Sequence, residues 1–248
     1  MIILKTDAQI EIMRKAGKIV AETLEMIGDK VKPGITTAEI DRAAEEFILS
    51  RGAKPAFKGY RGFPATTCIS INEEVVHGIP GNRMLVEGQI VSVDLGCIVN
   101  GFYGDSAATF PVGQISEEKR KLIEVTRRSL EVGLSHVKDG NKLGQVSAAI
   151  QKCVEDEGFS VVRDMVGHGI GKNLHEDPQV PHFGPEEAGP VLKKGMVIAI
   201  EPMVNAGGYQ VVQKADGWTI VTADGSDSAH FEHSVAVTDN GLDILTKL

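Results

Sequence analysis

The chain has 248 residues, of which 42% are hydrophobic and 24% are charged, and it carries a formal net charge of −8. This composition predicts one large or two small globular domains, and the acidic balance excludes a general nucleic-acid-binding surface, which needs clustered Lys and Arg. Three cysteines outside any CxxC motif, with no signal peptide and no apolar run long enough to span a membrane, predict a cytoplasmic protein.

Two helices are predicted before the first strands. Each begins with a capping box, Thr6 with Gln9 and Thr36 with Glu39. Apolar residues follow the first box at helical spacing, a KPG sequence separates the two helices, and Gly52 ends the second. Runs rich in Val, Ile and Thr then predict strands at 66–76, 90–95 and 105–112.

The second half of the chain repeats this order of elements. Ser116 opens a long predicted helix to about Val137, and another helix covers about 143–157 before Gly158. Gly-rich turns separate the short strands that follow, which are predicted around 160–166, 196–204, 209–214, 218–222 and 232–238.

Residue matches between the halves indicate an internal duplication. Residues 31–52 align without gaps on 137–158, and 85–94 align on 192–201. Between these blocks, VHGI resembles GHGI, so the alignment superposes His77 on His168 and Asp94 on Glu201. We expect pseudo-repeats of about 1–115 and 116–248, which fold against each other about a pseudo-twofold axis with a site in the shared crevice.

Four acids lie inside or at the edge of apolar, β-like runs: Asp94, Asp105, Glu201 and Glu232. One such acid is usually a solvated edge residue. Four buried together would repel one another, and each unpaired carboxylate costs several kcal/mol or must protonate. Partner cations or bound metal would relieve this cost, and no Lys or Arg lies inside these four runs. We therefore expect a metal site.

His168, in GHGIG, is the candidate nitrogen ligand, because its flanking glycines let the backbone come close and take unusual φ and ψ values. Alone, a histidine in a Gly-rich loop is more often structural, but its match with the acid set favours a ligand. One imidazole with four carboxylates suits Mn²⁺, Fe²⁺, Co²⁺ or Zn²⁺. Five ligands exceed a tetrahedral zinc site and suit two ions about 3.5–4 Å apart.

The segments DLG…GDSAAT, GHGIG…LHE, IEPM and FEH occur in this order. With them the chain resembles the methionine aminopeptidases of the pita-bread fold, and it is most similar to the bacterial type I group. The resemblance implies a single catalytic domain over 1–248 with an α+β fold: two pseudosymmetric halves, a curved antiparallel sheet and helices on its outer face. It implies that two divalent ions are held by five ligands, with Asp105 and Glu232 bridging: Asp94, Asp105, His168, Glu201 and Glu232.

The resemblance also implies roles for residues around the metals. His77 would face the scissile amide nitrogen and His175 the carbonyl oxygen, while Glu201 would take a proton from the bridging water. For both histidines the alternative is a hydrogen-bonded loop residue. The implied substrate-binding residues, which form a methionine pocket and its rim, are Tyr60, Phe63, Cys68, His77, His175 and Trp218. Phe57 and Leu174 depart from frequent usage at the pocket wall.

The implied activity is hydrolytic removal of the N-terminal methionine from nascent proteins with a small second residue. We expect a monomer that contacts the ribosome transiently, and a monovalent cation near Asn72 and Ser228. One alternative is a hydrolase of the prolidase or aminopeptidase P type, whose separate N-terminal domain has no room in this chain. The other is a non-catalytic binding relative, which would have lost metal ligands, whereas all five are present here.

Overall fold

The computed structural model describes residues 1–247, which contain four α-helices, a short 3₁₀ helix and fifteen strands. The helices are α1 (Asp7–Lys30), α2 (Thr37–Ser50), α3 (Glu117–Ser135) and α4 (Leu143–Glu155), and the 3₁₀ helix η1 is Tyr60–Gly62. The strands are β1 (Lys54–Pro55), β2 (Thr67–Ile71), β3 (Glu74–Val76), β4 (Ile90–Val99), β5 (Phe102–Pro111), β6 (Ser160–Val161), β7 (Gly167–Gly169), β8 (Glu176–Val180), β9 (Val197–Ile200), β10 (Met203–Asn205), β11 (Val211–Gln213), β12 (Ile220–Thr222), β13 (Ser228–His230), β14 (His233–Thr238) and β15 (Gly241–Ile244). No helix in this part of the chain is long and apolar enough to cross a membrane.

Both predicted capping boxes are confirmed. In α1 the Thr6 side chain accepts a hydrogen bond from the backbone N–H of Gln9, whose own side chain accepts from the backbone N–H of Thr6. Thr36 and Glu39 make the same reciprocal pair at α2. These bonds satisfy backbone donors that a helix start would otherwise leave free. The four α-helices also follow one another in the predicted order.

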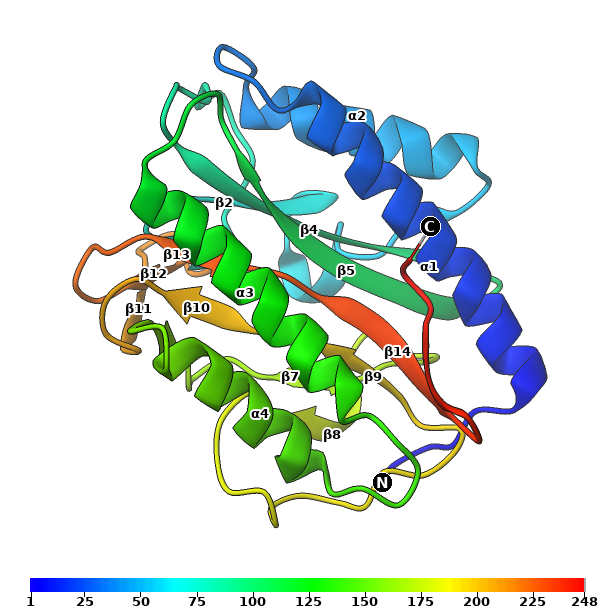
Figure 1. Ribbon diagram of the computed structural model, residues 1–248. Coiled ribbons are helices and arrows are strands. Elements are labelled where there is room, and N and C mark those ends of the chain that lie inside the picture. Colours follow the sequence, from blue (N-terminus) through cyan, green and yellow to red (C-terminus); the bar gives the residue numbers. More distant parts are fainter. Residues whose placement is uncertain (248) are drawn as a thin grey trace.

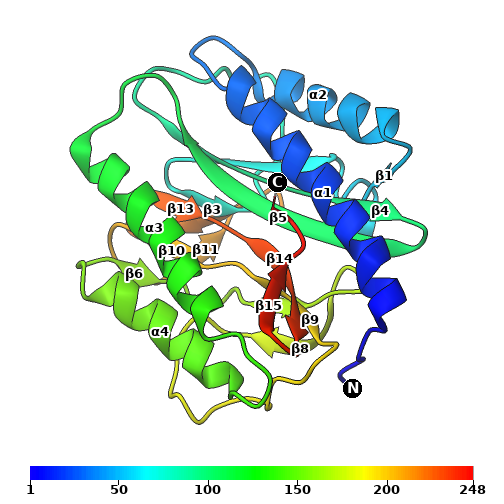
Figure 2. The ribbon, with the colours of Figure 1, turned by 45° about the vertical axis from the view of Figure 1, so that its right-hand side comes forward.

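The strands form four sheets in which every pairing among residues 1–247 is antiparallel. The first sheet has the order β1-β4-β2, with β5 also paired to β4, and the largest has the order β15-β14-β9-β7-β8. In Figure 1, α1 crosses the β4–β5 pair, whereas α3 and α4 lie over the strands of the second half. The view in Figure 2 shows the same two pairs of helices, with β15 beside β14.

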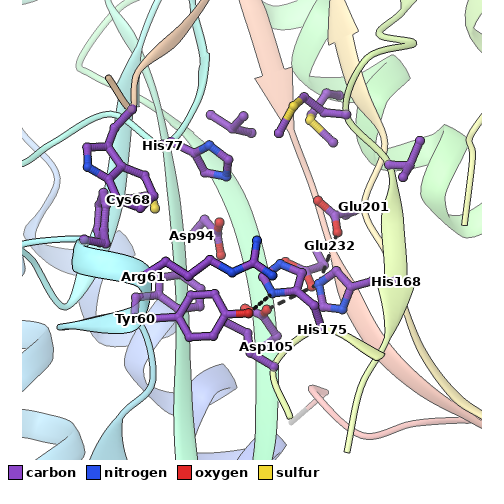
Figure 3. A pocket seen from close by; sticks show the side chains of 18 of the residues that line it. Tyr60, Arg61, Cys68, His77, Asp94, Asp105, His168, His175, Glu201 and Glu232 are labelled. Atoms are coloured by element: carbon purple, nitrogen blue, oxygen red, sulfur yellow. Dashed lines mark hydrogen bonds and ion pairs between the residues drawn. The ribbon is translucent and has the colours of Figure 1, made fainter. Parts of the chain in front are cut away.

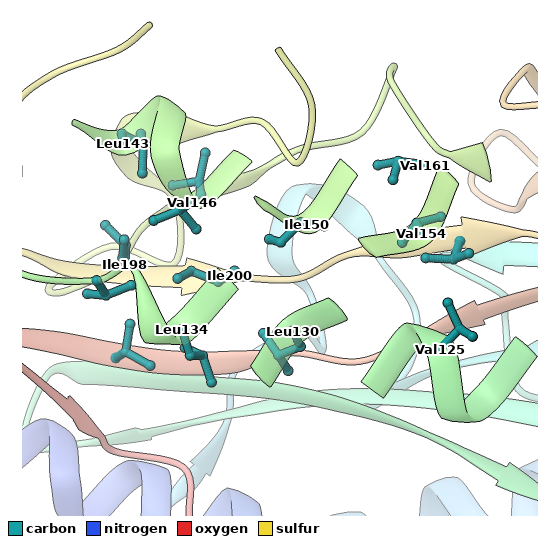
Figure 4. Packing of buried hydrophobic residues seen from close by; sticks show 14 of the residues in the cluster. Val125, Leu130, Leu134, Leu143, Val146, Ile150, Val154, Val161, Ile198 and Ile200 are labelled. Atoms are coloured by element: carbon teal, nitrogen blue, oxygen red, sulfur yellow. The ribbon is translucent and has the colours of Figure 1, made fainter. Parts of the chain in front are cut away.

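Each pair of helices covers its own hydrophobic core. Ile27 and Ile48 pack with strand residues such as Val93 on the first-half side. On the other side, α3 and α4 contribute a second cluster that packs on β9 and β14 (Figure 4). The labelled members of that cluster are Val125, Leu130, Leu134, Leu143, Val146, Ile150, Val154, Val161, Ile198 and Ile200. The strands between the two helix layers are thus covered by helices from both halves of the chain.

Several predicted strands had the wrong ends. Residues 66–76 form two strands, because Asn72 takes a left-handed φ of 55° between β2 and β3. The 90–95 and 105–112 strands are parts of a longer hairpin, β4–β5, closed by Asn100 and Gly101 with φ of 49° and 79°. Two positive φ values are typical of the type I′ turn that matches strand twist. Residues 196–204 also split, into β9 and β10, so Glu201 follows a strand and does not lie within one.

Candidate metal centre

The β4–β5 hairpin places two of the predicted ligands on one face. Asp94 pairs with Ala107 and Asp105 pairs with Gly96, so the two carboxylates are diagonal neighbours in the ladder. Side chains two residues apart on a strand point the same way, and diagonal neighbours are within reach of each other. Asp94 lies in the middle of β4, because the ladder continues to Val99, whereas the predicted strand ended at residue 95.

Hydrogen bonds between the halves bring the second pair of acids beside the first. The Ser234 hydroxyl donates to the backbone O of Asp105 at 2.7 Å and accepts from its N–H at 3.2 Å. Two residues before Ser234, the backbone N–H of Glu232 donates to the O of Ala107 at 3.0 Å. These bonds hold β14 against β5, and they fix Glu232 directly beside Asp105.

His168 lies in the strand β7, not in the predicted loop. Neither Gly167 nor Gly169 has a positive φ, so conformational freedom is not why glycine is needed here. A Cβ at Gly167 would lie 2.4 Å from the backbone O of Ala199, and one at Gly169 would lie 2.1 Å from the O of Asp177. Glycine is required because neighbouring strands approach closely on both sides of His168.

The five predicted ligands meet in one buried cluster. The Nε2 of His168 lies 3.5 Å from a Glu201 carboxylate oxygen and 3.9 Å from one of Asp105. One donor atom each from Asp105, His168 and Glu232 can be chosen so that all three lie within 4.8 Å of one another. Three buried oxygens, Asp94 Oδ1, Asp105 Oδ1 and Glu232 Oε1, have no hydrogen-bond partner. Such atoms are costly unless something else binds them, so this donor set fits divalent cations.

Burial and mutual repulsion raise the pKa values of these acids. Burial raises the pKa of Asp94 to about 7. The pKa values of Asp105 and Glu232 lie well above the ordinary range, first because of burial and then because of the neighbouring carboxylates. Burial, followed by the charge of Asp94, also raises the pKa of Glu201. Carboxyls with raised pKa values release protons when a cation binds.

A cavity of about 310 Å³ opens onto this cluster (Figure 3). Every predicted substrate-binding residue lines it, and so do Phe57 and Leu174. The rings of Phe63 and Trp218 meet edge to face with centroids 5.1 Å apart. Cys68 is buried, and this burial followed by the charges of Asp94 and Asp105 raises the pKa of its thiol well above 9.0. Cys68 is therefore a neutral wall of the cavity and not an activated nucleophile.

His77 and His175 reach the cavity from opposite halves. The hydroxyl of Tyr60 and the Nδ1 of His175 are 2.8 Å apart, and the imidazole rings of His175 and His168 are 4.3 Å apart between centroids. Partial burial, then His168 and Arg61, lower the pKa of His175, and burial lowers that of His77. Both imidazoles are thus neutral at pH 7 and can each donate one hydrogen bond.

Sequence reasoning missed four residues around the centre. His182 is buried, and its Nε2 accepts the backbone N–H of Glu201 at 3.0 Å. His230, also buried, lies 3.7 Å from the Glu201 carboxylate. Its position two residues before Glu232 in a β-like run was a usable signal. Arg61 and Asp164, both exposed, also line the cavity, and no motif marks them.

A buried set of carboxylates and one imidazole beside a cavity, within antiparallel sheets flanked by helices, defines a metal-dependent hydrolase.

The model of "Metallopeptidase family M24" matches residues 11–239. Over 248 residues the chain is 57% identical to "Methionine aminopeptidase 1" of Bacillus subtilis, with 100% of both chains covered. It is 49% identical to the Escherichia coli methionine aminopeptidase, over 98% of this chain and 93% of that one. The chain belongs to metallopeptidase family M24.

Solved structures agree with this assignment. The methionine aminopeptidase of Thermotoga maritima superposes with a TM-score of 0.99 and 50% identity, covering 100% of both chains. A prolidase from Pyrococcus furiosus gives a TM-score of 0.80 with 25% identity, and the match covers 99% of this chain and 66% of that one. The fold predicted from the sequence, that of the methionine aminopeptidases and prolidases, is confirmed. Membership in this family makes the chain a metal-dependent peptidase.

Proposed function

We propose that the chain hydrolyses the first peptide bond of peptides and nascent proteins that begin with methionine. The observation that carries this proposal is the buried donor cluster at one end of a cavity whose other end is apolar. High identity to methionine aminopeptidases over the full chain supports it. In this proposal the chain acts as one catalytic domain, and its two pseudo-repeats, about 1–115 and 116–248, each supply part of the centre.

We assign five ligands to two divalent ions: Asp94, Asp105, His168, Glu201 and Glu232. Asp105 and Glu232 would be shared by the two ions, since they are the two most buried acids of the set and the backbone hydrogen bond from Glu232 to Ala107 of β5 fixes them side by side. When bound, such ions polarise a carbonyl group and lower the pKa of water. The chain's own part would be to hold the donors, because three of their buried carboxylate oxygens have no hydrogen-bond partner and could bind the ions.

The residues around the cluster then have separate tasks. In this proposal the Tyr60 hydroxyl donates to Nδ1 of His175, so that the imidazole carries its proton on Nε2 and donates a hydrogen bond to the carbonyl oxygen, where negative charge grows. His77 faces the amide nitrogen from the other side. The Glu201 carboxylate accepts a proton from the attacking water, and His182 fixes the backbone of Glu201.

The apolar end of the cavity suits an unbranched thioether. Phe63, Cys68 and Trp218 present aromatic edges and a sulfur, which make favourable contacts with methionine. Phe57 and Leu174, both buried, close the wall where the sequence departs from frequent usage. We infer that a small second residue is preferred and that Phe57 sets how far the methionine side chain can extend.

A peptide panel tests the proposal. Chelator-treated protein restored with Mn²⁺ or Co²⁺ is offered Met-Ala-Ser, Met-Lys-Ser and Ala-Pro, and released amino acids are quantified. Cleavage of Met-Ala-Ser alone is expected. Cleavage of Ala-Pro supports a hydrolase of the prolidase type, whose solved relatives share the fold. A lack of cleavage with metal bound supports a binding protein.

Two finer expectations remain predictions. A monovalent cation is expected near Asn72 and Ser228, where the backbone O of Asn72 accepts the N–H of Ser228. The ammonium of Lys119 already donates to Asn72 Oδ1 at 2.9 Å, so a soluble cation would have to use other oxygens. We also propose a cytoplasmic monomer that meets its substrates at the ribosome.

A further inference from the structure

We propose that Arg61 reads the peptide beyond the scissile bond and favours substrates with an acidic third residue. This inference rests on the proposed function and adds a specificity to it. Arg61 belongs to η1 and lines the mouth of the cavity. Figure 3 shows its side chain running from this loop toward His175 and the carboxylate cluster.

The backbone of the loop is built to present this side chain. Arg61 has a φ of 50°, between Gly59 at 84° and Gly62 at 91°. An L residue with a side chain rarely adopts a positive φ, and where it does so the conformation is typically held for function. Arginine thus occupies a backbone conformation that glycine would adopt with less strain, which indicates that the arginine side chain has a function at this position.

The charge of Arg61 is not paired with an opposite charge among the described residues. Within residues 1–247 its guanidinium makes no ion pair with a carboxylate, and it lies over the Tyr60 ring at 5.4 Å from the centroid. In the proposed function two divalent ions balance the four carboxylates of the centre, so those acids do not neutralise it. Asp164, also exposed, lines the same cavity with the opposite charge and would repel a carboxylate that approached it instead of Arg61.

The direction of the substrate identifies the residue that Arg61 meets. The methionine side chain occupies the end formed by Phe63 and Trp218, and the scissile carbonyl faces His175. The exposed Arg61 side chain runs past Tyr60 toward His175 (Figure 3), so in this proposal the peptide that follows the scissile carbonyl passes the guanidinium. The second residue is small, so the third is the first whose side chain can carry a carboxylate to Arg61. A guanidinium binds a carboxylate through two parallel hydrogen bonds.

The test compares Met-Ala-Glu-Ser, Met-Ala-Gln-Ser and Met-Ala-Lys-Ser with the metal-loaded protein. We expect KM for the Glu peptide to be about threefold below that for the Gln peptide, as for an exposed ion pair, with kcat unchanged. The ratio falls to one in Arg61→Gln, is partly kept in Arg61→Lys, and reverses in favour of the Lys peptide in Arg61→Glu. Arg127→Gln, which removes an arginine from the outer face of α3, leaves the ratio unchanged.

Two results separate failure of this inference from failure of the proposed function. If all three peptides are cleaved and the Glu-to-Gln ratio is the same in the natural chain and in Arg61→Gln, Arg61 does not read the third residue. If the metal-loaded natural chain cleaves none of the three, the proposed function itself is wrong.

Discussion

Removal of metal should make the stability of this protein depend on pH in an unusual direction. Most proteins lose stability in acid because their carboxylates are paired when folded. Here burial raises the pKa of Asp94 from 3.8 to about 7, and the pKa values of Asp105, Glu201 and Glu232 are raised as well. The metal-free folded state therefore holds protons that the unfolded state has released. The stabilisation is fully present below about pH 4 and is lost as pH rises through about 7.

The magnitude follows from the size of the shift. For Asp94 it is about three pH units, and each unit corresponds to 1.36 kcal/mol, so this group alone accounts for at most about 4 kcal/mol. The other three acids add to the effect with the same sign. Burial lowers the pKa values of His175, His182 and His230 to about 3, so these groups act with the opposite sign below about pH 6.5, and the fall due to the acids shows above pH 7. Bound cations replace the protons, so the stabilisation by metal should grow as pH rises.

Urea unfolding of chelator-treated protein at pH 7, 7.5, 8 and 8.5, where the histidines are almost entirely neutral in both the folded and unfolded states, with and without added Mn²⁺, measures this. We expect the metal-free free energy of unfolding to fall across the series by several kcal/mol and the Mn²⁺-loaded value to stay nearly level. Asp94→Asn is the matched control, because it removes one titrating carboxyl and should flatten the metal-free curve. A metal-free stability that is constant or rises between pH 7 and 8.5 would refute the reasoning, since the carboxylates would then be ionised and tolerated without cations.

Three further predictions concern single side chains. Lys5→Met leaves the buried carboxylate of Glu176 without its partner at 2.7 Å and should lower the free energy of unfolding, measured in urea, by about 3–5 kcal/mol. If the double variant Lys5→Met, Glu176→Gln is no more stable than Lys5→Met, the unpaired carboxylate is not the cause of the loss. His77→Ala should keep both ions in metal analysis and lower kcat about 100-fold, whereas loss of metal would make His77 a ligand. Gly169→Ala should weaken Mn²⁺ binding in calorimetry and lower the melting temperature, because the added Cβ would lie 2.1 Å from a backbone oxygen. Gly81→Ala is the control, since a Cβ there meets open space, and it should change neither quantity. Equal effects of the two substitutions would contradict the close-approach argument.

The sequence predicts the elements whose signals are local. Capping boxes mark the starts of α1 and α2 correctly, because the bonds involved join residues three apart. The acids were recognisable because a charged residue inside an apolar run is unusual and must be compensated. The Asn100–Gly101 turn is equally local, yet the predicted strands stopped short of it, because polar and glycine residues there hide the extended ladder of β4 and β5.

Features that depend on contacts between distant segments could not be predicted in this way. Whether GHGIG is a strand or a loop is decided by Ala199 and Asp177 on the neighbouring strands β9 and β8, which no pattern around His168 reveals. The support of Glu201 by His182 is of the same kind, since 19 residues separate them. Arg61 reaches the cavity through an unusual backbone conformation and not through a motif.

The central claim is that the buried carboxylates and His168 hold two ions that remove an N-terminal methionine. It is tested most directly by titrating Mn²⁺ into chelator-treated protein while free methionine released from Met-Ala-Ser is quantified by mass spectrometry. We predict that release is absent without metal, rises with each equivalent and levels off at two bound ions per chain. Binding of Mn²⁺ with no methionine released at any loading would contradict the account.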